Sequence, residues 1–228
     1  MIALPRLYAI LDAGCFANPD ALFGAAEQLA SGGVTFIQYR NKSGNARVML
    51  EHARELRRLF ADHGSSNGAA SALVRPESTL GRGRPGLHGL IMNDRADLCL
   101  VADFDGVHVG QDDLSPESVR KIIGPKRLLG VSTHNPEQLS EADLTSADYL
   151  AIGPVFATAS KEKPDPVVGL EGVSRARALT RKPLVAIGGI TRANAASVIE
   201  AGADSVAVIS DLLRDPRKSA EEFFRILR

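Results

Sequence analysis

Eight short runs of apolar and β-branched residues recur along the chain, separated by stretches in which apolar residues return every three or four positions. Several runs are apolar almost throughout, which is typical of strands buried on both faces of a parallel sheet. The expected strands are residues 7–11, 35–40, 90–93, 106–109, 128–132, 149–153, 184–188 and 205–209. Eight strands alternating with helices in 228 residues predict an α/β protein, a single-domain (β/α)8 TIM barrel.

The connections between these runs carry helix-start signals. Four of the expected helices start with a capping side chain directly before a proline, which suits the first helical position. These pairs are Asn18-Pro19, Ser115-Pro116, Asn135-Pro136 and Asp215-Pro216. The rival architecture, an open doubly wound sheet, expects Gly-x-Gly-x-x-Gly after its first strand. The chain instead reads DAGC at 12–15, which favours the barrel.

Residues 64–88, between the second helix and the third strand, do not follow this rhythm. The segment is rich in Gly, Ser, Pro and Arg and has no helical periodicity. A connection of this length is unusual inside a compact domain. In a barrel it lies at the end opposite the catalytic rim. We therefore expect an accessory or partly disordered insertion rather than an active-site lid.

Composition argues against several classes of function. Lys plus Arg and Asp plus Glu both number 27, so no excess of positive charge indicates a nucleic-acid partner or a polybasic membrane module. No apolar run approaches the ~18 residues of a membrane helix, and the first residues make a poor secretory signal. The two cysteines form no disulfide framework and fit a reducing compartment. We expect a cytoplasmic protein. The sequence is compatible with a homo-oligomer but does not determine the oligomeric state.

Polar residues and glycines follow most of the expected strands. In a (β/α)8 barrel the carboxyl ends of all strands meet at one rim, where such enzymes keep their active sites. The residues at these ends are Gln38, Arg40, Lys42, Asn93, Asp94, Asp113, Ser132, Thr158, Ser160, Lys161, Gly188, Gly189 and Ser210. Segments that are far apart in the sequence are therefore expected to converge on one pocket.

The chemistry of this set points to anionic small-molecule ligands. Arg40, Lys42 and Lys161 supply positive charge, and Asp94 and Asp113 supply two carboxylates. Mg²⁺ is typically held by one or two carboxylates together with substrate phosphate oxygens. Glycines after the seventh strand and a serine after the eighth fit a backbone phosphate site. The sequence predicts a magnesium-assisted diphosphate site beside a glycine-lined monophosphate site.

Seven ordered motifs resemble those of the thiamine phosphate synthase family. They read QYRNK, IMNDR, GVHVGQDD, GVSTH, ADYLAIGPVFATASK, VAIGGI and AGADSVAVIS. The resemblance runs from about Leu7 to Leu213 and is broken only by residues 64–88. It implies a (β/α)8 transferase that condenses 4-amino-5-hydroxymethyl-2-methylpyrimidine diphosphate with a thiazole phosphate, giving thiamine phosphate and diphosphate. The implied mechanism is magnesium-dependent and dissociative: diphosphate leaves first, and the thiazole nitrogen attacks the resulting methylene cation.

The resemblance also implies roles for individual residues. Those expected to hold the pyrimidine diphosphate are Gln38, Arg40, Lys42, Asn93, Ser132 and Lys161, of which Arg40, Ser132 and Lys161 are expected to act in catalysis. Those expected to bind Mg²⁺ are Asp94 and Asp113. Those expected to hold the thiazole phosphate are Thr158, Ser160, Gly189, Ile209 and Ser210. The family usually has Pro-Thr-x-Thr-Lys after the sixth strand, whereas this chain has ATASK at 157–161, which keeps a hydroxyl but loses the rigid proline.

Two other functions stay open on the sequence. A thiazole tautomerase of the same fold needs a proton-transfer base, which His134 could supply, and needs no metal. A non-catalytic relative would bind phosphate ligands without turnover. The two carboxylates and Lys161 favour the synthase. The sequence supports a Schiff-base aldolase least, because that chemistry needs a desolvated lysine at a strand end and none of the eight runs contains lysine.

His108 is expected to be a structural residue of the barrel interior.

Overall fold

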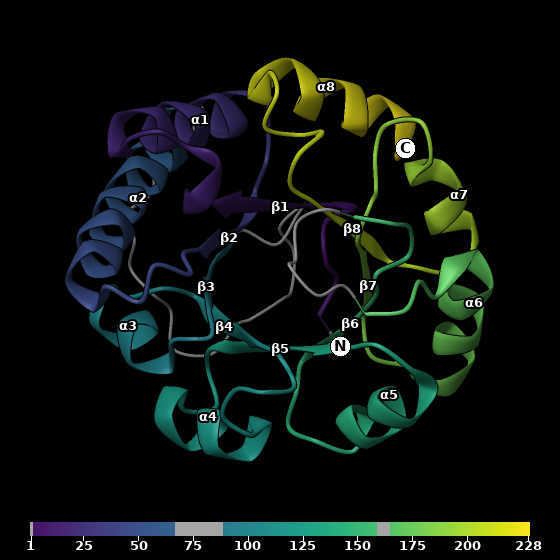
Figure 1. Ribbon diagram of the computed structural model, residues 1–228. Helices are drawn as coiled ribbons and strands as arrows, with labels where there is room; N and C mark the ends of the chain where they lie inside the picture. Colours follow the sequence, from purple (N-terminus) through teal and green to yellow (C-terminus); the bar gives the residue numbers. More distant parts are fainter. Residues whose placement is uncertain (1, 67–88, 159–164) are drawn as a thin grey trace.

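The chain forms a closed barrel of eight parallel strands surrounded by helices (Figure 1). The computed structural model describes residues 2–66, 89–158 and 165–228. The strands are β1 Leu7–Asp12, β2 Phe36–Arg40, β3 Gly89–Asn93, β4 Gly106–Val109, β5 Leu128–Thr133, β6 Tyr149–Ile152, β7 Leu184–Ile187 and β8 Ser205–Val208. Each strand pairs in parallel with the next, and β8 closes the barrel against β1. The fold class expected from the sequence is confirmed, and every strand lies within one residue of its expected limits.

The helices alternate with the strands and form the outer ring. They are η1 Ala13–Cys15, α1 Pro19–Ser31, α2 Ala46–Ser66, α3 Ala96–Val101, α4 Pro116–Ile123, α5 Pro136–Asp143, α6 Gly169–Leu179, α7 Ala195–Glu200 and α8 Pro216–Ile226. Three expected caps form: Asn18 Oδ1 accepts from Ala21 N at 2.9 Å, Ser115 Oγ from Ser118 N at 3.3 Å and Asn135 Oδ1 from Gln138 N at 2.8 Å. Each cap satisfies a backbone N–H that has no partner within its helix. Asp215 precedes α8 as expected but makes no side-chain cap hydrogen bond.

Two hydrophobic layers result from the alternation of side chains along each strand. One set points outward and packs against the helices, with Leu22 and Leu29 of α1 among the helix residues that it meets. The other set fills the inside of the barrel; it consists of Tyr8, Ile10, Phe36, Ile91, Leu128, Tyr149, Ala151, Val185 and Ala207. The barrel is therefore a packed core, and a ligand can enter only above it, at the mouth.

The expected insertion is only partly described. α2 continues to Ser66, so the backbone of residues 64–66 is helical, although the sequence placed these residues in the insertion. Residues 67–88 lie outside the described part of the chain, and their expected accessory role stays a prediction. Within the described ranges, no helix combines the length and the apolar character that crossing a membrane requires.

Candidate functional site

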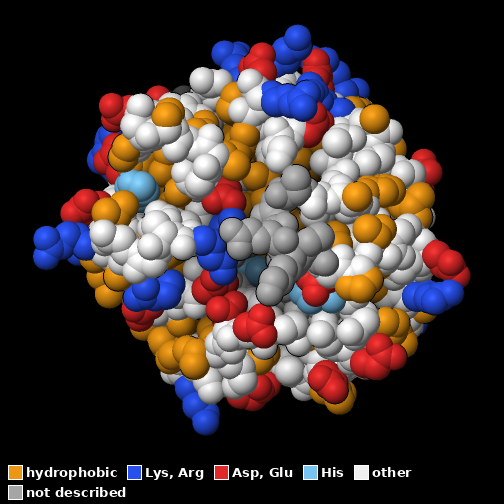
Figure 2. All heavy atoms as spheres, in the orientation of Figure 1, with side chains coloured by type: hydrophobic (Ala, Val, Ile, Leu, Met, Phe, Trp, Pro, Cys, Tyr) orange, Lys and Arg blue, Asp and Glu red, His pale blue; other side chains and the backbone are white. Residues whose placement is uncertain are grey.

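Charged side chains gather in the middle of the face onto which Figure 2 looks. The strand register brings the strand ends together: Asp12 at the end of β1 lies beside Arg40 at the end of β2, and Asn93 at the end of β3 lies beside His108 of β4. The expected convergence of distant segments at one mouth is thus present for the described residues.

Asp94 and Asp113 meet at this mouth, as the sequence predicted. Asp94 follows β3, where its N–H donates to the His108 carbonyl at 2.8 Å and its φ is 61°. Asp113 accepts a hydrogen bond from Gly110 N at 2.8 Å. Burial raises the pKa of Asp94; Lys42, whose Nζ lies 2.5 Å from Asp94 Oδ2, lowers it, and the adjoining Asp113 carboxyl raises it.

Two neighbouring carboxylates that repel each other suit a divalent cation. In the described part of the chain, no group of three or more His, Cys, Asp or Glu side chains could by itself hold a metal. Mg²⁺ usually takes only one or two protein carboxylates and completes its octahedron with water and substrate phosphate oxygens. The donor set of Asp94 and Asp113 therefore fits Mg²⁺ better than a metal that needs three or four protein ligands.

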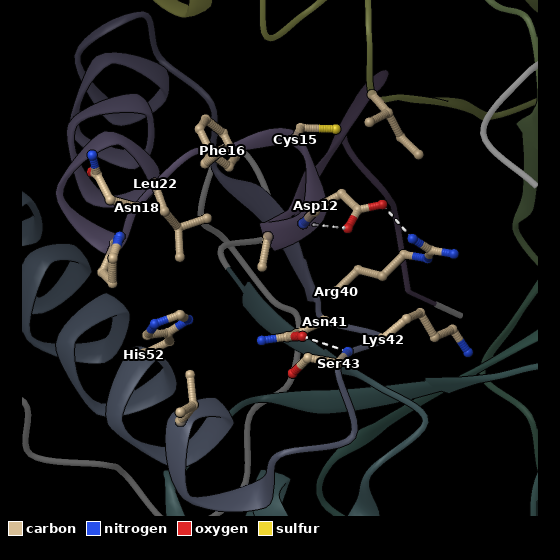
Figure 3. Close-up of a pocket in the computed structure, with 15 residues that line it drawn as sticks. Asp12, Cys15, Phe16, Asn18, Leu22, Arg40, Asn41, Lys42, Ser43 and His52 are labelled. Carbon is tan, nitrogen blue, oxygen red and sulfur yellow. Dashed lines mark hydrogen bonds and ion pairs between the residues drawn. The ribbon is translucent and has the colours of Figure 1, made fainter.

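Arg40 has an acidic partner that the sequence analysis did not single out. Its guanidinium forms an ion pair with Asp12, whose other oxygen accepts from Gly14 N at 3.1 Å (Figure 3). The Asp12 side chain is only 10% exposed, so it is a fixed counter-charge rather than a solvated one. Asp12 ends β1, and the same strand-end rule that found Asp94 could have found it.

A cavity of about 660 Å³ opens beside Arg40, between α1, α2 and the ends of β1 and β2 (Figure 3). Its polar lining includes Asp12, Arg40 and Lys42, and its apolar wall includes Phe16 and Ile209. A volume of this size is typical of small-molecule sites. The wall formed by residues 13–19, which connect β1 to α1, was not foreseen from the sequence.

The neutral polar residues of the predicted site lie deeper, where the mouth meets the barrel interior. Gln38 and Asn93 are 3% and 8% exposed. Gln38 Nε2 donates to the hydroxyl of Tyr8 at 2.8 Å, and Ser132 Oγ lies 2.8 Å from His108 Nε2. His108 lies in the barrel interior, as the sequence predicted, and burial lowers its pKa to about 4, so the imidazole is neutral near pH 7.

The loops after β6, β7 and β8 form the opposite side of the mouth. Gly188 and Gly189 have φ of 99° and 63°, a region that glycine adopts without strain. A Cβ at Gly189 would lie 2.6 Å from the carbonyl oxygen of Ala157, one residue before Thr158. The backbone of the β6 loop therefore approaches that of the β7 loop as closely as only glycine allows.

An arginine that the sequence analysis missed joins the β7 and β8 loops. Arg192 donates to both carboxylate oxygens of Asp211 at 3.0 Å, its backbone N donates to the same carboxylate, and its guanidinium also pairs with Glu222 of α8. Asp211 directly follows Ser210, so this pairing fixes the loop that carries two predicted phosphate contacts, Ile209 and Ser210.

Two predicted residues cannot be placed. Ser160 and Lys161 lie outside the described residues, and their roles stay predictions. His134, the candidate base of the alternative activity, is at the rim, where its Nδ1 donates to the Gly153 carbonyl at 2.6 Å and lies 3.6 Å from Asp165. None of the eight strands contains a lysine, in agreement with the argument against a Schiff-base enzyme.

Comparison with known proteins gives a consistent result. Residues 86–212 match the family model TMP-TENI, described as thiamine monophosphate synthase. A thiamine-phosphate synthase of Koribacter versatilis is 56% identical over 99% of this chain and 97% of its own length. One from Chloroflexus aurantiacus is 42% identical over 90% of this chain and 83% of its own length.

A solved structure agrees with these sequence relatives. The thiamine phosphate pyrophosphorylase from Pyrococcus furiosus has a TM-score of 0.77 and 31% identity, and the match covers 97% of this chain and 95% of that one. A more distant barrel, a 3-hexulose-6-phosphate synthase at 15% identity and a TM-score of 0.63, shares the fold alone.

Proposed function

Because this chain belongs to the thiamine monophosphate synthase family, we propose that it is a transferase that joins 4-amino-5-hydroxymethyl-2-methylpyrimidine diphosphate to a thiazole phosphate. The products are thiamine phosphate and diphosphate. One observation at the site supports this proposal most. Two adjoining carboxylates, Asp94 and Asp113, lie at one mouth, and Lys42 forms an ion pair with Asp94.

We place the reaction in the cytoplasm, because the free Cys15 and the buried free Cys99 fit a reducing compartment.

The pyrimidine diphosphate is assigned to the side of the mouth formed by β2 to β5. Gln38, Asn93 and Ser132 are assigned to the ring near the barrel interior. Arg40, Lys42 and Lys161 are assigned to the diphosphate. Asp94 and Asp113 would hold Mg²⁺, which would supply positive charge beside the leaving diphosphate. The C–O bond breaks with its electron pair on the diphosphate oxygen, and the aminopyrimidine stabilises the methylene cation.

The thiazole phosphate is assigned to the loops after β6, β7 and β8. Backbone N–H groups at Gly189, Ile209 and Ser210 and the hydroxyls of Thr158 and Ser160 hold its phosphate, because such groups bind anions without a charged side chain. The thiazole nitrogen then donates its lone pair to the methylene carbon and forms the new C–N bond. The protein contributes positioning and charge stabilisation, which are the main sources of rate enhancement in such a transfer.

We expect diphosphate release from the purified chain only when both substrates and Mg²⁺ are present. Adding a chelator should reduce the rate to background, and restoring Mg²⁺ should recover it, because the two carboxylates alone repel the leaving group. The measurement is a coupled diphosphate assay, with thiamine phosphate followed by chromatography. Double-bond migration in the thiazole alone would instead support the tautomerase, and ligand binding without either reaction would support the non-catalytic relative.

An Asp12→Asn variant should turn over about tenfold more slowly, with a KM for the pyrimidine diphosphate close to that of the wild type. The amide oxygen can still accept from Gly14 N, but the charge that fixes Arg40 is lost. The positive charge itself remains, so binding changes less than catalysis. Steady-state kinetics test this, with Asp20→Asn in the first turn of α1 as the control. An unchanged kcat in Asp12→Asn would contradict a positioning role for Asp12.

A further inference from the structure

A chain of hydrogen bonds crosses the barrel interior beneath the mouth and joins five different strands. Gln38 Nε2 of β2 donates to Tyr8 OH of β1 at 2.8 Å, and Tyr8 OH lies 3.0 Å from Tyr149 OH of β6. Tyr149 OH lies 3.1 Å from His108 Nδ1 of β4, and His108 Nε2 lies 2.8 Å from Ser132 Oγ of β5. The two ends of this chain, Gln38 and Ser132, are both assigned to the pyrimidine substrate.

The barrel leaves space for this chain at one specific position. A Cβ at Gly130 of β5 would lie 2.1 Å from Tyr149 Cζ and 2.4 Å from His108 Nδ1. Any side chain there would separate the tyrosine from the histidine. Tyr8 and Tyr149 are buried at 1% and 0% exposure, so bulk solvent does not reach their hydroxyls and a lost partner leaves a buried polar group unsatisfied. The contact between Tyr149 and His108 is therefore built into the packing.

The proton positions along this hydrogen-bond chain follow from its buried hydroxyl and imidazole groups. Tyr8 already accepts from Gln38, so its single hydroxyl proton is satisfied only if it goes to Tyr149. The Tyr149 proton then goes to His108 Nδ1. Both ring partners of this buried imidazole are neutral hydroxyls, so it is neutral, and its one proton sits on Nε2 and is donated to Ser132.

We propose that this chain fixes the hydrogen-bond directions of the two residues at its ends. Ser132 accepts from His108, so its hydroxyl proton is held ready to donate to a ligand. Gln38 donates through Nε2, so its Oε1, which accepts no hydrogen bond from the described residues, is held as an acceptor. Tyr149 and His108 are positioning residues that act through Ser132. The chemistry recognised is that of an aminopyrimidine, with an amino donor and ring-nitrogen acceptors, so the inference rests on the proposed function.

A double-mutant cycle tests whether Tyr149 acts through Ser132. We expect Tyr149→Phe to lower kcat/KM for the pyrimidine diphosphate about tenfold, as the loss of one oriented hydrogen bond does. In a Ser132→Ala background the same change should alter kcat/KM less than about twofold, because the group that it orients is gone. Additive effects of the two substitutions would overturn the positioning role.

Tyr39→Phe is the matched control, because Tyr39 OH also contacts a histidine, His52 Nδ1, at 2.9 Å, but on the outer side of β2. Its effect should be small and additive with Ser132→Ala. Where Tyr149→Phe does not fold, as judged by circular dichroism, His108→Phe removes the imidazole that donates to Ser132 and takes its place in the cycle.

A second measurement needs neither substrate nor turnover. Nitrogen-15 NMR of the histidine-labelled wild-type protein, with the His108 signals assigned by their loss in His108→Gln, reports which ring nitrogen carries the proton. We expect a neutral ring protonated at Nε2. A proton on Nδ1, or a charged ring at neutral pH, would overturn the proposed direction. A protein that shows the Nε2 tautomer but no coupling activity would contradict the proposed function and leave the hydrogen-bond chain in place.

Discussion

An Asp94→Asn variant should lose about 100-fold or more in turnover while unfolding at a temperature no lower than the wild type. Asparagine keeps the size and one oxygen of the side chain but removes the charge that would bind Mg²⁺. The like-charge contact with Asp113 disappears, which favours the folded state. The lost ion pair to Lys42 costs little, because the lysine side chain is 56% exposed.

The choice of asparagine over alanine matters for this test. Asp94 has a φ of 61°, in the left-handed region that asparagine adopts more readily than alanine. An alanine variant would combine backbone strain with the loss of the carboxylate, and the two effects could not be separated.

Kinetics at increasing Mg²⁺ concentrations and a thermal melt measure both quantities for Asp94→Asn. The control is Asp97→Asn, in the first turn of α3, whose carboxylate pairs with Arg95 away from Asp113. Near-normal turnover of Asp94→Asn at the Mg²⁺ concentration that saturates the wild type would remove the basis for the metal assignment.

A Gly189→Ala variant should be destabilised by about 2–5 kcal/mol and should bind the thiazole phosphate at least about tenfold more weakly. Alanine at a φ of 63° costs about 1–2 kcal/mol. Its Cβ would lie 2.6 Å from Ala157 O and 2.7 Å from Phe156 Cβ, an overlap that typically costs about 1–3 kcal/mol more. Pushing these loops apart moves the backbone N–H group at Gly189 away from the phosphate, and one charge-assisted hydrogen bond is worth about 1.5–3 kcal/mol.

Denaturant unfolding and the KM for the thiazole phosphate test this prediction together. Gly24→Ala is a suitable control, because it lies within α1 and a Cβ there meets nothing within 4 Å. That substitution should stabilise the protein by about 0.5–1 kcal/mol, as alanine does in place of glycine inside a helix. A Gly189→Ala protein with wild-type stability and unchanged KM would show that the glycine-lined cradle is not the phosphate site.

The barrel itself could be predicted because its signals are local. Each strand is a short apolar run between turn residues, and apolar residues return every three or four positions once a helix begins. Asn18-Pro19 is one example: it predicts a helix start with no knowledge of the rest of the chain, and the cap forms as expected. Parallel strands in a closed barrel then place all their carboxyl ends at one rim, so Arg40, Asp94 and Asp113 could be assigned to the same mouth.

The partners of these residues could not be predicted, because side-chain pairing depends on the angles and distances between strands. Nothing near Arg40 in the sequence indicates Asp12, which lies 28 positions earlier and is its partner through the β1–β2 register. Arg192 and Asp211 likewise meet only because β7 and β8 are neighbours.

Taken alone, the sequence determined the architecture, the rim and the kinds of charge that collect there, since periodicity and strand order are properties of the chain itself. The tertiary structure decided which groups touch: the contact of Asp94 with Asp113, and the interior chain from Gln38 to Ser132. The physical reason is that hydrogen bonds form only within about 3 Å and at restricted angles. Residues drawn from five strands reach that range only after the barrel has closed and its core has packed around them.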